Sequence, residues 1–248
     1  MSRVAVIGGT GMNEWPNFTV QKQTSVITPY GAPSASLLHG RIHGVDAIFL
    51  ARHGTGHKIP PHRINYRANL WALQEAGVRT VIAIAAVGGI ARNMPPAAVC
   101  VPDDLIDYTY GREHTYSDGE QQPLLHVDFS APYSTVARKI LLQSARRARV
   151  KITARGVVGV AQGPRLETPA EIRRMQRDGC TMVGMTGMPE ASLARELGLE
   201  YATLALSVNW AAGLGSGDIH GEIEKCIADG MVKVRAILAE ALPELAVD

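Results

Sequence analysis

The apolar residues of the chain fall into short continuous runs that alternate with helical patterns. The runs at 4–7, 80–87 and 201–208 are rich in β-branched and small apolar residues, and such runs are typical of strands buried on both faces of a parallel sheet. Residues 24–51 instead hold short alternating runs broken by prolines and glycines, which predicts an antiparallel meander. Further patterns predict helices over 65–76, 134–149, 189–197 and 222–242, and strands over 99–106, 156–161 and 181–185. We therefore expect an α/β fold with a mixed, largely parallel sheet flanked by helices.

Local signals mark several boundaries in this pattern. Thr168, Pro169 and Glu171 form a capping box with proline at the first helical position, and Gly77 supplies a C-terminal stop for the helix over 65–76. The segment 108–133 is long, polar and dotted with aromatic residues, and loops of this kind are usually functional or interfacial. We find no repeat, linker or low-complexity segment, so we predict one domain over residues 1–248.

Composition excludes several classes of function. The net charge of +2 is small and dispersed, which argues against a nucleic-acid or acidic-membrane partner. No apolar window is long enough to span a membrane, the N-terminus carries no cleavage signal, and the three cysteines lie far apart. These features predict a cytoplasmic protein. Asp103 and Asp104 lack a third ligand at metal spacing, so we predict no metal site.

Asn209 closes the apolar run at 201–208 and is followed by small residues. In an open α/β sheet, ligands bind just past the carboxyl ends of strands. An amide at this place donates and accepts at once, which suits the Hoogsteen edge of a 6-oxopurine. Taken alone, this position is also typical of an asparagine that merely begins a turn.

Two further strand ends carry groups suited to an anion. Gly9 and Thr10 follow the run at 4–7 within a glycine turn, and Arg52 and His53 follow the meander; backbone N–H groups and a guanidinium fork both bind phosphate well. A plain turn and an ordinary charged loop remain alternatives. A dinucleotide-binding dehydrogenase is excluded, because Glu14 replaces the last glycine of the fingerprint and no acidic ribose clamp follows.

Taken together, these motifs resemble the trimeric branch of the purine nucleoside phosphorylases, and especially its methylthioadenosine phosphorylase subgroup. The resemblance implies a three-layer phosphorylase/hydrolase-like α/β fold, and a homotrimer or dimer of trimers without cofactor. It also implies phosphorolysis, in which inorganic phosphate displaces the base of a nucleoside. Its carriers are Ile7–Gly11, Thr28–Ser34, Ala51–Gly54, Asn65–Asn69, Gln162–Arg165, Gly184–Glu190 and the strand that ends at Asn209.

The resemblance also implies roles for individual residues. The phosphate-binding positions of the family are occupied by Thr10, Arg52, His53, Ala86 and Thr186. Arg52, His53 and Asn209 are the catalytic candidates, acting through positioning and electrostatic stabilisation. One departure stands out, since Ala85 replaces a hydroxyl or amide donor of the family.

The base-reading positions favour a 6-oxopurine. Adenine-specific members of the family carry two aspartates where this chain has Asn209 and Ala211, whereas Asn209 and Glu167 match the enzymes that read 6-oxopurines. Leu166 takes the place of a stacking aromatic residue. Because an unpaired buried polar group costs about 1–3 kcal/mol, such a site should discriminate between amino- and oxopurines.

The 5′ substituent is specified less sharply. Met185 matches the residue beneath the ribose, and His126 matches one that enters the neighbouring subunit's site. Ile219 could line a methylthio pocket, whereas His220 resembles the histidine that meets a 5′-hydroxyl. We therefore favour methylthioinosine, with methylthioadenosine second and inosine or guanosine third. A weak purine-binding protein is a further alternative, supported by Ala85, while Arg52 and His53 argue against a water-using nucleosidase.

Overall fold

A computed structural model describes residues 3–9, 18–117, 119, 123–215 and 219–247, with side chains throughout except at 219–222, 224 and 225. Its centre is one mixed sheet in the strand order β2-β3-β4-β1-β5-β9-β8-β7, with β10 paired to β5 and β6. The strands are β1 (Val4–Gly8), β2 (Phe18–Thr24), β3 (Leu37–Ile42), β4 (Val45–Ala51), β5 (Thr80–Gly89), β6 (Val99–Cys100), β7 (Asp104–Asp107), β8 (Val157–Val160), β9 (Met182–Gly184) and β10 (Glu200–Trp210).

The parallel core of the sheet consists of β4, β1, β5 and β10. The predicted antiparallel meander is confirmed for β3 and β4, and it begins earlier than the predicted range of 24–51, because β2 at 18–24 pairs antiparallel with β3. At the other side, β7, β8 and β9 are mutually parallel, and β9 joins the end of β5 in the antiparallel sense. The carboxyl ends of β1, β4, β5 and β10 therefore lie at one edge of the molecule, where ligands of open α/β sheets bind.

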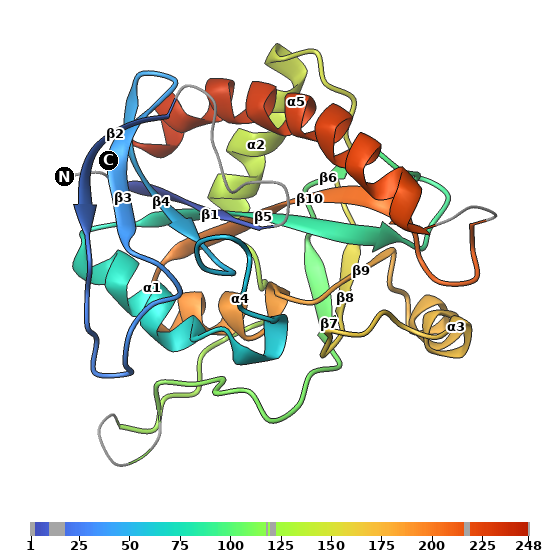
Figure 1. Ribbon diagram of the computed structural model, residues 1–248, viewed down its shortest axis with the longest axis horizontal. Coiled ribbons are helices and arrows are strands. Elements are labelled where there is room, and N and C mark those ends of the chain that lie inside the picture. The colour runs from blue at the N-terminus through green and yellow to red at the C-terminus, as the bar shows by residue number, and fades with distance from the viewer. Residues whose placement is uncertain (1–2, 10–17, 118, 120–122, 216–218, 248) are drawn as a thin grey trace.

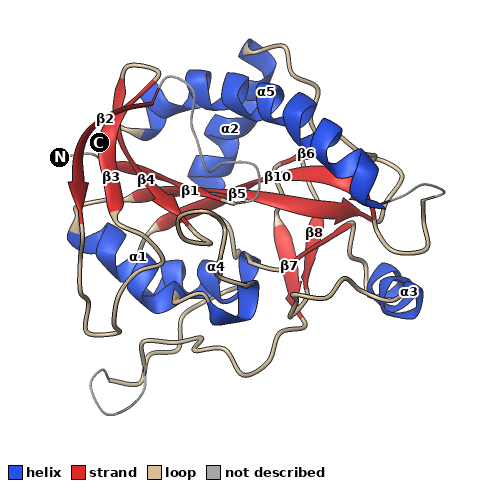
Figure 2. Ribbon diagram, viewed as in Figure 1, coloured by secondary structure: helices blue, strands red, loops and turns tan. Residues whose placement is uncertain are grey.

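Helices cover both faces of this sheet and make three layers (Figures 1 and 2). One face packs against α2 (Thr135–Arg147) and α5 (Ile219–Leu245), and the opposite face against α1 (Tyr66–Glu75) and α4 (Gly187–Glu196). A shorter helix, α3 (Pro169–Arg177), lies beside β8 and β9 (Figure 1). None of the helices in the described part of the chain is long and apolar enough to cross a bilayer.

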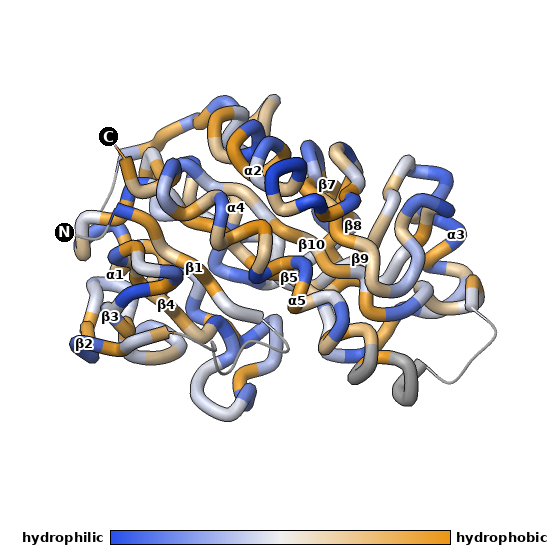
Figure 3. Tube along the Cα trace, turned by 90° about the horizontal axis from the view of Figure 1, so that it is seen from above, coloured by the Kyte–Doolittle hydropathy of each residue, from blue (hydrophilic) through white to orange (hydrophobic). Residues whose placement is uncertain are grey.

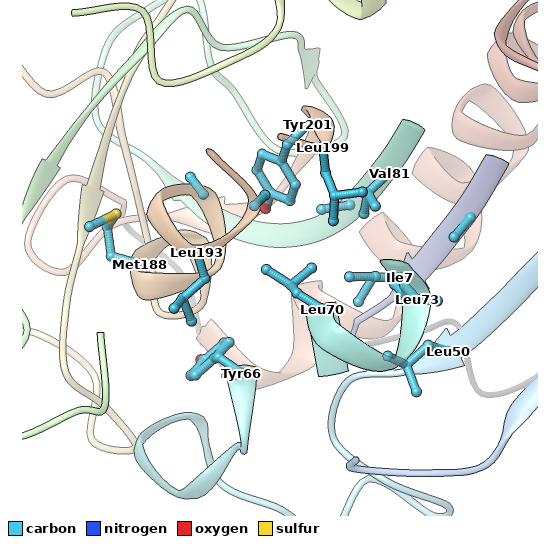
Figure 4. Close-up of a cluster of buried hydrophobic side chains, with 14 of the residues drawn as sticks. Ile7, Leu50, Tyr66, Leu70, Leu73, Val81, Met188, Leu193, Leu199 and Tyr201 are labelled. Carbon is cyan, nitrogen blue, oxygen red and sulfur yellow. The ribbon is translucent and has the colours of Figure 1, made fainter. Parts of the chain in front are cut away.

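Strand periodicity divides the core between the two helical layers. In β1, Ala5 and Ile7 belong to the cluster beneath α1 and α4, whereas Val4 and Val6 belong to the cluster beneath α2 and α5. This alternation follows from the two-residue period of a strand. Figure 4 shows Ile7 beside Leu73 of α1 in the first cluster. Viewed from above, the trace of β1 and β10 is largely hydrophobic, while α3 at the rim is largely hydrophilic (Figure 3).

The predicted capping box at Thr168 and stop at Gly77 are confirmed, and the structure adds two side-chain caps that were not predicted. The Asn65 and Ser134 side chains accept from the third backbone N–H beyond them, those of Ala68 and Ala137. Thr168 and Glu171 form both bonds of the capping box. Gly77 has a φ of +84°, a backbone conformation that glycine adopts at little cost.

Several predicted boundaries need correction, and one of them is that of β10, which does not end before Asn209 but runs on to Trp210. The single strand expected over 99–106 is two strands, β6 and β7, because the chain leaves the sheet at Pro102 and the Asp103 carboxylate accepts from Gly156 N at 2.8 Å. β5 runs two residues further than predicted, to Gly89. Both α4 and α5 begin earlier than predicted, and Met188 within α4 keeps an extended backbone.

Candidate active site

A pocket of about 440 Å³ opens at the carboxyl ends of β4, β5, β9 and β10. It brings together most of the predicted site residues, although they are far apart in sequence. Those that line it are Arg52, His53, Ala86, Leu166, Glu167, Met185, Thr186 and Asn209.

The remaining predicted residues are not placed in this pocket. Thr10 lies outside the described residues, and so do the side chains of Ile219 and His220, whose backbone begins α5. His126 is exposed in the long loop before α2 and is not among the residues that line the pocket.

Gly9 allows the strand ends to approach closely at the floor of the pocket. A Cβ at Gly9 would lie 2.7 Å from the Ile84 carbonyl oxygen and 2.9 Å from Arg52 Nη1. Both distances are shorter than van der Waals contact, so only glycine fits here. The glycine after β1 therefore has a steric role in addition to the anion-binding role predicted for its turn.

Arg52 is fixed rigidly at the end of β4. Its side chain is 1 % exposed, and its Nε and Nη2 donate to the two carboxylate oxygens of Glu190 at 2.7 and 2.8 Å. Nη1 donates to the carbonyl of Ile84 at 2.9 Å. Burial alone would lower the pKa of Arg52, but Glu190 raises it above its ordinary value, so the charge is retained. Three of the five guanidinium N–H groups are thus occupied, and two remain for a ligand.

Glu190 completes a buried cluster that the sequence did not single out as a site. It comes from α4, and its Oε1 also accepts from the Tyr201 hydroxyl at 2.8 Å. A buried carboxylate is stable only when paired and hydrogen-bonded. The cluster therefore joins β4, α4 and β10 immediately behind the pocket.

His53 follows Arg52 and is nearly buried. Its Nδ1 lies 2.8 Å from the Ile59 carbonyl oxygen, and Ile59 N donates back to the carbonyl of His53 at 2.9 Å. The His57 ring lies 4.2 Å from the His53 ring, tilted by 31°. Burial, with further contributions from the charge of Arg52 and from His57, lowers the pKa of His53 to about 4.

Asn209 sits after an irregularity in β10. Ser207 pairs with Val87 and Asn209 with Gly88, so Val208 is an extra residue and forms a β-bulge. Bulges commonly re-aim a side chain next to an active site. The Asn209 Nδ2 donates to the Trp210 carbonyl at 2.6 Å, which fixes the orientation of the amide because a carbonyl can only accept. Among the residues that the structure describes, the second N–H and the Oδ1 of Asn209 have no partner.

Glu167 and Leu166 lie on the loop after β8 and line the same pocket. Leu166 is 46 % exposed and gives this wall an apolar surface. Burial raises the pKa of Glu167, and the nearby Glu171 carboxylate adds to the shift. The Glu171 carboxylate is itself held by Arg165 and by the capping box, so its position is fixed.

Arg112 ties two pocket-forming loops together. Its guanidinium donates to the carbonyls of Ala161 and Gln162 after β8, and to those of Met185 and Met188 after β9. It also donates to the Gln162 side chain and the Tyr66 hydroxyl. Only a planar fork can satisfy so many acceptors at once. Arg112 therefore positions the loops that carry Met185 and Leu166 without lining the pocket itself.

Several other lining residues were also absent from the predicted site. His57, Lys58, Ile59 and Pro60 form the wall after β4, and Ile223 of α5 closes the far side. At the end of β4, only Arg52 and His53 directly follow the predicted strand. The loop beyond them carries no sequence pattern that would indicate a binding site. In the described part of the chain, no group of three His, Cys, Asp or Glu side chains could hold a metal ion.

Comparison with known proteins agrees with this geometry. The sequence profile of the phosphorylase superfamily matches residues 3–243. The chain is 50 % identical over 243 residues to a probable S-methyl-5′-thioinosine phosphorylase of Pseudomonas syringae pv. tomato, which covers 98 % of this chain and 99 % of that protein. It is 41 % identical over 249 residues to the 6-oxopurine nucleoside phosphorylase of Pyrococcus furiosus, with 98 % and 93 % covered.

A solved structure extends the agreement to the fold. The methylthioadenosine phosphorylase of Schistosoma mansoni in complex with adenine superposes with a TM-score of 0.91 at 32 % identity, over 100 % of this chain and 93 % of that chain. The predicted three-layer architecture is confirmed, and so is the resemblance on which it rested. The chain therefore belongs to the phosphorylase superfamily, in the family of purine nucleoside and methylthioadenosine phosphorylases.

Proposed function

We propose that this enzyme cleaves methylthioinosine with inorganic phosphate, giving hypoxanthine and 5-methylthioribose 1-phosphate. A phosphate oxygen forms a bond to the anomeric carbon of the ribose while the bond from that carbon to the purine nitrogen breaks. The purine takes the electron pair of the broken bond and then a proton from solvent. No metal or organic cofactor is needed for this displacement.

The orientation of Asn209 carries the proposal. Its remaining N–H donates to the purine O6, and its Oδ1 accepts from the protonated N7 of the departing base. The Glu167 carboxylate accepts from the purine N1–H. In adenine, N1 has no hydrogen and would face this carboxylate acceptor to acceptor, so the same site disfavours the aminopurine.

Phosphate binding falls to the opposite end of the pocket. The two free N–H groups of Arg52 and the hydroxyl of Thr186 are its donors, together with the backbone N–H of Ala86. Met185 lines the same pocket, and in this proposal its side chain packs against the ribose. Thr10 is a further donor in this proposal.

We further propose a homotrimer or a dimer of trimers, in which His126 of each subunit enters the site of its neighbour. The exposure of His126 and of Leu124, which is 72 % exposed in the same loop, supports this arrangement. Ile219 and His220, at the start of α5, are proposed to meet the 5′ substituent. The buried thiols of Cys100 and Cys180 support a cytoplasmic location.

Methylthioadenosine phosphorylase is the second candidate, favoured by the close match to the Schistosoma fold. The test is incubation of the enzyme with methylthioinosine or methylthioadenosine, each with and without phosphate, followed by chromatography of the released base. We expect hypoxanthine to appear much faster than adenine, and only with phosphate. Faster release of adenine would support the second candidate, and release without phosphate would contradict phosphorolysis.

Two variants assign the preference to the residues. Asn209→Ala should lower kcat/KM for methylthioinosine by about 10- to 100-fold, since it leaves the purine edge without partners. Glu167→Gln presents an N–H to purine N1. It should therefore reduce the ratio of kcat/KM for methylthioinosine to kcat/KM for methylthioadenosine. An unchanged ratio in Glu167→Gln would remove Glu167 from base recognition.

A further inference from the structure

The proton on the His53 ring can be placed from its neighbours. Nδ1 is 2.8 Å from the carbonyl oxygen of Ile59. A carbonyl oxygen only accepts hydrogen bonds, so Nδ1 must carry the hydrogen. In a neutral ring, Nε2 is then a bare acceptor with a lone pair.

The surroundings of His53 keep the ring neutral. The guanidinium of Arg52 and the ring of His57 lie on one side, and Lys58 lines the same wall of the pocket. The Glu190 carboxylate is engaged by Arg52 and Tyr201, and no carboxylate contributes to the pKa shift of His53 among the described residues. Burial, with further contributions from the charge of Arg52 and from His57, lowers the pKa of His53 to about 4, so a second proton is disfavoured at neutral pH.

The bare nitrogen is accessible to a ligand. Nε2 has no hydrogen-bond partner in the described part of the chain, and it is not sealed off by protein atoms. His53 lines the pocket beside Arg52 and Thr186, the donors proposed for phosphate. A lone pair therefore stands among donors in an anion site.

We propose that His53 Nε2 accepts a hydrogen bond from the hydroxyl of the phosphate co-substrate, so that the pocket selects tetrahedral anions that carry an acidic hydrogen. The proposal deepens the proposed function and rests on it. A fully deprotonated oxygen placed at Nε2 would meet a lone pair and be repelled. Hydrogen phosphate offers one P–OH to Nε2 and three other oxygens to Arg52, Thr186 and the backbone.

Two consequences follow for the chemistry. The oxygen that attacks the ribose is one of the unprotonated oxygens, because the hydroxyl is held at His53 and keeps its hydrogen in the sugar phosphate. Hydrogen arsenate, which also carries a hydroxyl, should bind like phosphate. Sulfate has the same shape and charge as hydrogen phosphate but carries no hydrogen near neutral pH, so it leaves Nε2 unpaired.

The first test reads the ring directly. Two-bond ¹⁵N–¹H correlation spectra of the labelled enzyme near neutral pH report the protonation of each histidine nitrogen, and the His53 signals are assigned by their loss in His53→Asn. We expect Nε2 to remain unprotonated when inorganic phosphate saturates the site, with a shift change from the new hydrogen bond. Protonation of both nitrogens on phosphate binding, or no response to phosphate, would overturn the proposal.

The second test compares anions by calorimetry. The wild-type enzyme should bind phosphate at least about tenfold more tightly than sulfate, as expected for an unmatched buried acceptor. His53→Asn can keep the donor to Ile59 while lacking Nε2, and His53→Gln places an amide N–H near that position. In both variants the affinities for phosphate and sulfate should become similar. His53→Asn should bind phosphate more weakly, whereas His53→Gln should bind sulfate more tightly. Equal wild-type affinities for phosphate and sulfate would refute the selection.

These measurements test the anion selection by His53 separately from the proposed cleavage of nucleosides. Phosphate binding with a neutral His53, in an enzyme that cleaves none of the nucleosides offered, would leave the anion selection intact and contradict the proposed function. Phosphate-dependent cleavage by an enzyme whose His53 becomes cationic would support the proposed function and contradict the anion selection.

Discussion

Glu190 and Arg52 form a two-pronged ion pair at the back of the pocket, with each side chain only 1 % exposed. The pair joins a residue at the end of β4 to one in α4, 138 residues further along the chain. It fixes one edge of the guanidinium, and Arg52 itself lines the pocket. The orientation of the principal cation in the site thus depends on a carboxylate that does not line the pocket.

Replacing Glu190 by glutamine should destabilise the enzyme strongly. The substitution keeps the shape but leaves the Arg52 charge buried without a countercharge, and breaking a buried pair costs about 3–5 kcal/mol. Urea denaturation monitored by circular dichroism measures the loss. The matched control is Glu244→Gln, which removes one partner of Arg147 where both side chains are about 40 % exposed. We expect a change below about 1 kcal/mol there, and equal losses at both positions would contradict the assignment.

Restoring a donor at position 85 should improve phosphate binding. Ala85 borders the pocket and also a small cavity of about 10 Å³, lined in part by Tyr133 and Thr203, so a hydroxyl can be accommodated. A hydrogen bond to a charged group contributes about 1.5–3 kcal/mol, and we expect Ala85→Ser to lower KM for phosphate by about tenfold or more with little change for the nucleoside. Steady-state kinetics with each substrate varied in turn measures both constants. Ala83→Ser, on the same strand but outside the pocket, should leave KM for phosphate unaltered.

Replacing Arg112 by lysine should impair both nucleoside binding and stability. An ammonium group cannot serve the carbonyls on both loops, so Arg112→Lys should raise KM for the nucleoside several-fold and lower the unfolding free energy by about 2–4 kcal/mol. Arg138 is the control, because it donates to the carbonyls of Pro102 and Ala154 away from the pocket. Arg138→Lys should lose stability with an unchanged KM. A similar rise in KM in both variants would show that lost stability, not loop position, controls binding.

Acid should destabilise the fold through His53. The unfolded ring takes up a proton near 6.5 and the folded ring only near about 4, so the unfolded state binds more protons between these values. The free energy of unfolding should therefore fall as the pH is lowered from 6.5 to 4, by up to about 3 kcal/mol from this residue, and His53 should have no effect above that range. Denaturation of the wild type and of His53→Asn at several pH values measures the contribution. If the free energy of unfolding depended on pH in the same way in both proteins, the contribution of His53 would be contradicted.

The parts of this molecule that depend on local chemistry are well predicted from sequence. The capping box at Thr168, the helix stop at Gly77 and the strand end before Arg52 are set by neighbours within a few residues. Since the carboxyl ends of parallel strands share an edge, the residues that follow them could be expected to converge, and they do.

The remaining features depend on contacts between distant segments. The sequence around Glu190 does not indicate that it pairs with Arg52. The sequence around Arg112 likewise does not indicate that its side chain bonds to two separate loops. The break between β6 and β7 was missed for a similar reason, because the bond from Gly156 to Asp103 joins residues 53 positions apart. The tautomer of His53 likewise becomes defined only once Ile59 is seen opposite Nδ1.

The pocket draws its lining from Gly9 near one end of the chain to Ile223 in the last helix. Its lining comes from segments spread over most of the chain, so only the folded chain brings all of them together around a ligand. Occupancy therefore acts on the whole molecule, and a ligand at a hundred times its dissociation constant adds about 2.7 kcal/mol to the free energy of unfolding. Saturating phosphate and nucleoside should thus extend the lifetime of this enzyme against proteolysis, so that the supply of substrate also regulates how much of the catalyst survives.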